Sequence, residues 1–124
     1  MNRKILIVDD SPVSRKIVRK CLPKGQTFDV FEAVDGKDAI EQFKKNNPDV
    51  TLLDLTMPVM DGVAALEEIM KLNQNAAVAV LTADIQQKTV EKVMELGALM
   101  VVPKPVSAEA IEEALTKAMQ HLSA

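Results

Sequence analysis

The segment Lys4-Ile5-Leu6-Ile7-Val8-Asp9-Asp10-Ser11-Pro12 decides the fold. Its apolar run, residues 5–8, has no polar alternation, which is typical of a parallel strand that is buried on both faces. Two acidic residues follow the run directly. Ser11 and Pro12 then open a helix, with serine as its N-cap and proline at the first helical position, where a missing N–H costs nothing. The segment therefore predicts a strand, an acidic loop and a helix in succession.

The rest of the chain repeats this alternation of strand and helix. Strands are expected at residues 4–8, 28–34, 50–53, 76–81 and 99–102, and helices begin near residues 11, 36, 63, 84 and 107. Gly97 is expected to end the fourth helix as a left-handed C-cap. Short loops and right-handed crossovers between such units produce a parallel sheet with helices on both faces. We therefore expect one (βα)₅ α/β domain over residues 1–124, with no output domain.

The composition excludes several classes of function. Of the 124 residues, 48% are hydrophobic, only 2% are aromatic, and the net charge is −3. A chain of this kind offers neither a base-stacking surface nor a basic patch, so nucleic acid is not an expected partner. No apolar run approaches the roughly 20 residues of a membrane span, and no signal peptide is visible. Cys21 is the only cysteine, which favours a reduced, cytoplasmic setting without disulfides.

The first helix combines an apolar stripe with a basic face. Val13, Ile17, Val18 and Cys21 are expected to turn towards the core. The basic side chains on or near this helix have two interpretations, a solvated helix face or a docking face for an acidic protein. They are Arg15, Lys16, Arg19, Lys20 and Lys24.

A second apolar run, residues 50–53, also ends in an acid, Asp54. Because the carboxyl ends of parallel strands meet at one edge of the sheet, Asp9, Asp10 and Asp54 should lie together there. Clustered carboxylates repel one another unless a cation joins them. The hard divalent cation that suits such oxygen ligands most simply is Mg²⁺, so we expect a metal site.

Three further residues are expected at the same edge. Lys104 follows the apolar run 99–102 and stands between Pro103 and Pro105, with a candidate cis peptide bond before Pro105. Its ammonium group would neutralise part of the acidic cluster and offer a point cation to a phosphoryl group. The hydroxyl group of Thr82 and the backbone N–H of Ala83 could donate to an oxyanion.

The loop from Asp54 to Gly62 leads into the third helix. Pro58 stiffens the loop, and Asp61 is expected to have a structural role as the cap of that helix. Gly62 allows the chain to turn close to the site.

Four motifs together resemble the receiver domain of bacterial two-component response regulators. They are Asp9-Asp10, Asp54 within DLTMPVMDG, Thr82-Ala83 and Lys104-Pro105. The resemblance covers the whole chain, with these motifs in order and suitably spaced. It implies a flavodoxin-like, doubly wound, five-stranded parallel sheet of order 2-1-3-4-5. It also implies a stand-alone, chemotaxis-regulator-like protein that receives a phosphoryl group from a histidine kinase or histidine phosphotransfer protein. Three roles are open to such a protein: chemotaxis-type effector, phosphorelay intermediate or phosphate sink. Such a protein signals through contact with a downstream protein, as a monomer or weak dimer.

The resemblance also assigns roles to individual residues. Asp54 would accept the phosphoryl group. Asp10, Asp54 and the backbone carbonyl of Thr56 would ligate Mg²⁺ directly, while Asp9 would act mainly through water. The phosphoryl oxygens would be bound by Lys104, Thr82 and the N–H of Ala83. One position departs from the family pattern, because Val101 stands where an aromatic residue is usual three positions before the lysine.

Two other classes of function remain open on the sequence. An Mg²⁺-dependent phosphohydrolase with an aspartyl nucleophile commonly has a general acid two residues after that nucleophile, whereas this chain has Thr56 there. A flavodoxin-like cofactor binder would need a glycine-rich phosphate loop after the first strand. It would also need aromatic residues to stack on a flavin. The chain has no such loop, and its only aromatic residues are three phenylalanines, with no Trp or Tyr.

Overall fold

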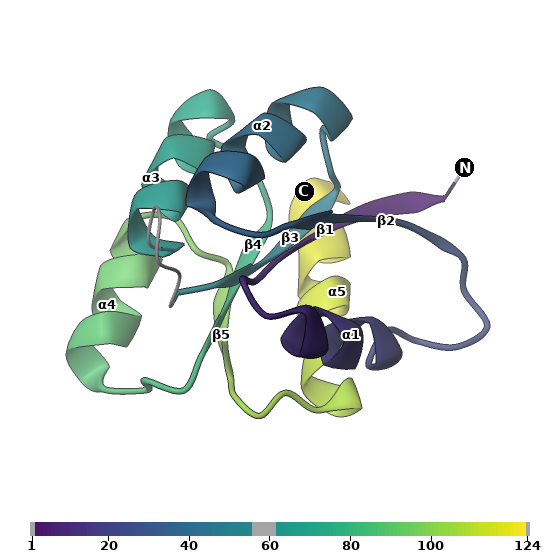
Figure 1. The fold of residues 1–124 in the computed structure, drawn as a ribbon. Coiled ribbons are helices and arrows are strands. Elements are labelled where there is room, and N and C mark those ends of the chain that lie inside the picture. The colour runs from purple at the N-terminus through teal and green to yellow at the C-terminus, as the bar shows by residue number, and fades with distance from the viewer. Residues whose placement is uncertain (1, 56–61, 124) are drawn as a thin grey trace.

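The computed structural model describes residues 2–55 and 62–123. Strands and helices alternate along these residues, as Figure 1 shows. The elements are β1 (Arg3–Val8), α1 (Pro12–Lys20), β2 (Phe28–Ala33), α2 (Gly36–Asn46), β3 (Val50–Asp54), α3 (Gly62–Leu72), β4 (Val78–Thr82), α4 (Gln87–Glu95), β5 (Met100–Pro103) and α5 (Ala108–Ser123). The expected order of elements is confirmed.

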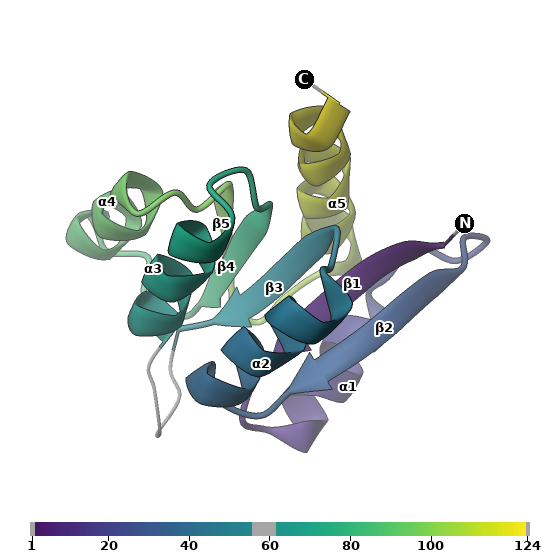
Figure 2. The same ribbon diagram turned by 90° about the horizontal axis from the view of Figure 1, so that it is seen from above.

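Within the described residues, five parallel strands form one sheet in the order β2-β1-β3-β4-β5. The order and the flavodoxin-like α/β class match the sequence expectation. Figure 2 shows β1 and β3 side by side near the middle of the sheet. The register pairs Val8 with Leu53 and Asp54 with Leu81. The carboxyl ends of the central strands are therefore level with one another, which gathers the residues that follow them.

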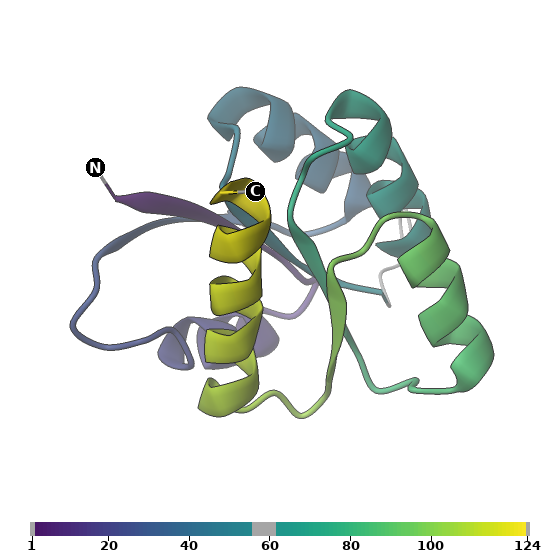
Figure 3. The same cartoon turned by 180° about the vertical axis from the view of Figure 1, so that it is seen from behind.

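Helices cover both faces of the sheet, and each face has its own core. On one face, α2, α3 and α4 pack against side chains such as Leu6, Leu53 and Val80. On the other, α1 and α5 pack against side chains such as Ile7 and Leu52. Figures 1 and 3 show α2 and α3 on the opposite side of the sheet from α1 and α5. Alternate residues of one strand face the two cores, which explains the continuous apolar runs in the sequence.

The first helix differs from expectation in what it buries. Val18 is buried and Cys21 is half-buried, but Val13 is 68% exposed and Ile17 is 47% exposed. The predicted inward orientation of these two residues is wrong. Ile17 lines a hollow of about 140 Å³ between α1 and the β5–α5 connection, together with Val106, rather than the core. The inner contact of this short helix is concentrated at Val18.

The fourth helix begins later than the sequence suggests. Asp84 precedes the helix, and its carboxylate accepts hydrogen bonds from the N–H of Gln86 (3.1 Å) and the hydroxyl group of Thr89 (2.8 Å). The acidic side chain therefore organises the entry to α4 from outside it. At the other end, Gly97 has φ +111°, which confirms the expected left-handed residue.

Candidate functional site

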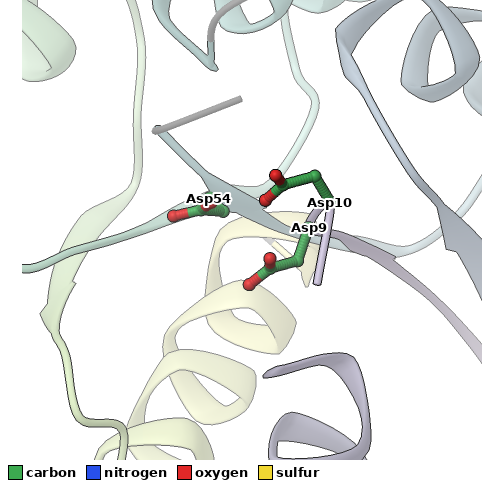
Figure 4. Close-up of side chains that lie close together, drawn as sticks. All are labelled: Asp9, Asp10 and Asp54. Atoms are coloured by element: carbon green, nitrogen blue, oxygen red, sulfur yellow. The ribbon is translucent and has the colours of Figure 1, made fainter. Parts of the chain in front are cut away.

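Three acidic side chains meet at the carboxyl edge of the sheet. Asp9 and Asp10 follow β1, and Asp54 ends β3, as Figure 4 shows. Each offers a carboxylate oxygen, and these oxygens lie within 4.8 Å of one another. Asp9 and Asp54 are buried, whereas Asp10 is exposed. The predicted convergence of these three residues is confirmed.

Lys104 enters the acidic cluster from the end of β5. Its Nζ lies 3.0 Å from Oδ1 of Asp54 and 3.1 Å from Oδ2 of Asp9. Its backbone N–H donates to the carbonyl oxygen of Thr82 at 2.9 Å, which fixes the base of the side chain. Burial lowers the pKa of the Lys104 ammonium group, but the hydrogen bonds and charges of Asp54 and Asp9 outweigh it and raise the pKa overall. The lysine is therefore fully charged at neutral pH.

The rest of Asp9 is also held in place. Its Oδ1 accepts a hydrogen bond from the N–H of Ser11 at 2.9 Å, and its own N–H donates to the carbonyl oxygen of Ala33 at 3.1 Å. Its carbonyl oxygen accepts from Nη1 of Arg15 at 2.8 Å. With Lys104 on Oδ2, both carboxylate oxygens of Asp9 have a protein partner. Asp9 is thus anchored by several elements of the fold.

Two of the basic residues of α1 pair with an acidic side chain of the neighbouring strand β2. Arg15 and Arg19 each donate from Nε to a different carboxylate oxygen of Glu32, at 2.6 and 2.8 Å. The sequence pattern places both arginines among the other cations of the helix and does not connect them with β2. The opposite charge of Glu32 is visible in the sequence, but its pairing depends on the strand register, which places Glu32 opposite Ile7 of β1.

Thr82 ends β4 beside this cluster, and Ala83 follows it on the surface. The Thr82 side chain is buried, and its Oγ1 accepts the N–H of Asp84 at 3.0 Å. Its hydroxyl hydrogen therefore remains available for donation to another acceptor. The candidate cis peptide between Lys104 and Pro105 is present.

Gly62 approaches the site from the start of α3. Its N–H donates to the carbonyl oxygen of Leu55 at 2.9 Å. A Cβ atom at this position would collide with the carbonyl oxygen of Asp54 and the Cα atom of Leu55. The close turn that the sequence analysis expected here is confirmed. Thr56 and Asp61, for which a metal-binding carbonyl and a helix cap were expected, lie outside the described residues.

The donor set fits a magnesium ion. All three convergent side chains are carboxylates, which are hard oxygen donors, and two of them are withdrawn from solvent. One lysine balances only part of their charge, so a divalent cation is electrostatically favoured. The acidic triad is therefore typical of an Mg²⁺ site.

Comparison with known proteins decides the family. The model of the response regulator receiver domain matches residues 5–116. The chain belongs to the response regulator receiver family. The chemotaxis protein CheY of Thermotoga maritima is 36% identical over 117 residues, covering 94% of this chain and 98% of the relative. The sporulation initiation phosphotransferase F of Bacillus subtilis is 34% identical, covering 94% of each chain.

A solved receiver structure is similar throughout. In the CheX–CheY–BeF₃–Mg²⁺ complex of Borrelia burgdorferi, the matching chain is 29% identical and superposes with a TM-score of 0.88. The match covers 94% of this chain and 89% of that chain. That complex contains the metal inferred for the acidic triad here.

As a receiver domain, this protein is a phosphoacceptor in CheY-like signalling rather than a conventional enzyme. The assignment decides against the phosphohydrolase and the flavodoxin-type cofactor binder. A receiver domain implies a kinase as its partner. No helix within residues 2–55 and 62–123 is long and apolar enough to cross a membrane.

Proposed function

We propose that Asp54 accepts a phosphoryl group from a phosphohistidine on a histidine kinase or a histidine phosphotransfer protein. The observation that carries this proposal is the position of Lys104, whose Nζ lies 3.0 Å from Asp54 inside the acidic triad. The ammonium group favours the ionised carboxylate, which is the nucleophilic form. The same cation can follow the phosphoryl oxygens once the group has been transferred.

The transfer exchanges one bond for another. A carboxylate oxygen of Asp54 attacks phosphorus in line with the P–N bond, so a P–O bond forms while the P–N bond breaks. The electron pair of the broken bond stays on the donor imidazole, which takes up one proton from solvent and ends as neutral histidine. Positioning and charge neutralisation supply most of the rate in reactions of this type.

We assign the metal to Asp10, Asp54 and the backbone carbonyl of Thr56, with Asp9 acting mainly through water. The Asp9 assignment is supported by the two partners that occupy its carboxylate, the N–H of Ser11 and the ammonium group of Lys104. When bound, Mg²⁺ supplies charge neutralisation to the carboxylates and the phosphoryl oxygens.

We assign the phosphoryl oxygens to Lys104, the Thr82 hydroxyl group and the N–H of Ala83. The Thr82 assignment is supported by its hydrogen bond with Asp84, in which the hydroxyl group accepts and therefore keeps its hydrogen for a phosphoryl oxygen. A move of Thr82 towards the phosphoryl group would change this bond at the entry to α4. A downstream protein could then distinguish the two states by contact.

The phosphodonor protein is proposed to dock on α1. Val13 and Ile17 are exposed on this helix, and Ile17 shares its hollow with Lys104 and Pro105. An apolar contact at this place would bring a donor histidine to the acidic edge of the sheet. We propose that residues 1–124 act there as a single receiver domain, monomeric or weakly dimeric, and that the exchange occurs in the cytoplasm.

Phosphate incorporation tests the proposal. Wild type, Asp54→Asn and the surface control Asp29→Asn are incubated with Mg²⁺ and either acetyl phosphate or phosphoramidate, whose P–N bond resembles that of phosphohistidine. Intact mass is then measured. We expect the mass of wild type and Asp29→Asn to increase by one phosphoryl group. Neither protein should gain this mass when EDTA is present during the incubation, and Asp54→Asn should not gain it at all. An equal gain in Asp54→Asn, or no gain in wild type with either donor, would contradict the proposal.

A further inference from the structure

The side chain of Arg15 connects three elements behind the acidic triad. Arg15 lies in the first half of α1, and its side chain is only 14% exposed. Nε donates to Oε1 of Glu32 in β2 at 2.6 Å, while Nη1 donates to the carbonyl oxygen of Asp9 at 2.8 Å. Only a planar guanidinium group offers two such donors in a fixed relation. The arginine therefore joins α1, β2 and the chain that leaves β1.

The carbonyl group that Arg15 binds belongs to the peptide that joins Asp9 to Asp10. Because this peptide unit is planar, fixing its oxygen also fixes the N–H and the Cα direction of Asp10. In the described part of the chain, no hydrogen bond or ion pair holds the exposed Asp10 carboxylate itself. The direction of the Asp10 side chain therefore depends on its backbone, and the backbone depends on Arg15.

Glu32 holds the guanidinium group of Arg15 at β2, behind the acidic triad. Burial raises the pKa of the Glu32 carboxyl group, but the hydrogen bonds and charges of Arg15 and Arg19 outweigh it and lower the pKa overall. Glu32 is thus ionised at neutral pH and offsets one of the two guanidinium charges that it binds. The carboxylate therefore weakens the repulsion that the guanidinium group of Arg15 exerts on a metal ion, without removing it.

We propose that Arg15 is a positioning residue of the metal site, which orients the Asp9–Asp10 peptide so that Asp10 faces Asp54 and Mg²⁺ binds at full affinity. This inference rests on the proposed function, because it requires Asp10 and Asp54 to share the metal. Groups that orient metal ligands from behind commonly change metal affinity by about 10–100-fold when they are removed.

The direction in which Mg²⁺ affinity changes when Arg15 is replaced distinguishes a positioning role from a purely electrostatic one. Removing a cation near a metal site should strengthen Mg²⁺ binding by electrostatics alone. Loss of the hydrogen bond from Arg15 to the Asp9 carbonyl oxygen should weaken Mg²⁺ binding. Arg19 supplies a matched control, because it binds the same Glu32 carboxylate through Nε at 2.8 Å, whereas the Asp9 carbonyl is bound by Arg15.

The experiment measures Mg²⁺ affinity by isothermal titration calorimetry, without phosphodonor, in wild type, Arg15→Met, Arg15→Lys and Arg19→Met. Urea unfolding of each variant shows that it is folded. We expect roughly tenfold weaker Mg²⁺ binding for Arg15→Met. Binding should be several-fold weaker for Arg15→Lys, because lysine keeps the positive charge but lacks the two planar donors of a guanidinium group. Arg19→Met should stay within about twofold of wild type. Phosphorylation of the Arg15 variants should need more Mg²⁺ for half-saturation, with a near-normal rate at saturation.

Unchanged or tighter Mg²⁺ binding in the Arg15 variants would overturn the inference, and so would equal weakening in Arg19→Met. If Arg15→Met does not fold, the comparison of Arg15→Lys with wild type gives the same decision. Failure of wild type to bind Mg²⁺ or to take up phosphate would instead count against the proposed function.

Discussion

At the scale of single residues, Lys104 is the cation that pairs with the two buried carboxylates of the site. Its side chain is 26% exposed, whereas the Asp9 and Asp54 side chains that it pairs are 2% and 4% exposed. Its pKa is raised in the folded state, so its contribution to stability is complete below the ordinary pKa of 10.5 and is lost only as the pH rises through the raised value. At pH 7 both pairs therefore act at full strength.

Lys104→Met should consequently destabilise the metal-free protein. Removing the cation leaves two buried carboxylates beside each other, and the free energy of unfolding should fall by about 2–4 kcal/mol. Urea unfolding at pH 7 measures this loss, which should shrink with saturating Mg²⁺ because the metal replaces the missing charge. The control is Lys117→Met, since this lysine forms an exposed pair with Glu113 on α5 and should cost less than about 0.5 kcal/mol. Equal losses in the two variants would contradict this account.

The sequence could identify Asp9, Asp10, Asp54 and Lys104 because each follows an apolar run that ends at the same edge of a parallel sheet. That argument needs only the strand direction, which the alternation of elements provides. Arg15 could not be found in this way. Its contacts depend on which residue of β2 lies beside α1, and side-chain charge on a helix does not reveal that register.

At the scale of elements, β3 contains an uncompensated polar group. Thr51 lies between Leu6 of β1 and Val78 of β4 and is 1% exposed. Its Oγ1 has no hydrogen-bond partner among the residues that the structure describes. A buried hydroxyl group without a partner costs free energy, whereas a methyl group of the same shape does not.

Thr51→Val should therefore stabilise the protein by about 1 kcal/mol in urea unfolding. Thr82→Val is the matched comparison, because it makes the same change in the adjacent strand β4. There the hydroxyl group accepts the N–H of Asp84, so its removal should destabilise the protein by about 1 kcal/mol. Effects of the same sign in both variants would show that the hydrogen bonding of these two hydroxyl groups does not decide the outcome.

Element boundaries were harder to predict than elements. The apolar runs of β1, β3 and β4 identify central strands because burial on both faces leaves continuous hydrophobic sequence, whereas the more polar, alternating sequence of β2 is typical of an edge strand. The sequence predicts the start of α4 too early, at Asp84, because aspartate is a common residue at helix N-termini. In the structure its side chain organises the turn before the helix instead. The prediction for Val13 and Ile17 is wrong because periodicity identifies an apolar stripe but does not show which part of it the core covers.

At the scale of the whole molecule, the fold brings together charges that lower the free energy of unfolding of the protein. The parallel order brings three carboxylates within 4.8 Å, and Lys104 balances only part of their charge. Asp10 is the member that makes no contact with Lys104 among the described ion pairs, so its charge adds repulsion without compensation. The metal-free protein should therefore be less stable than its core alone would allow, and Mg²⁺ should restore the difference.

Asp10→Asn tests this conflict between stability and function. Without metal, loss of one partly screened repulsion should raise stability by about 1 kcal/mol, or a midpoint increase of roughly 3–6 °C. With Mg²⁺, wild type should gain stability in proportion to the logarithm of metal concentration, while Asp10→Asn should gain little because a ligand is missing. Thermal unfolding over a series of Mg²⁺ concentrations measures both effects, with Asp29→Asn on the exposed part of β2 as the control for a change in net charge. If Asp10→Asn were less stable than wild type without metal and responded equally to Mg²⁺, the acidic triad would not be a strained metal site. The order of stability should instead reverse as Mg²⁺ is added, because the same three carboxylates that destabilise the empty fold bind the ion that the receiver needs.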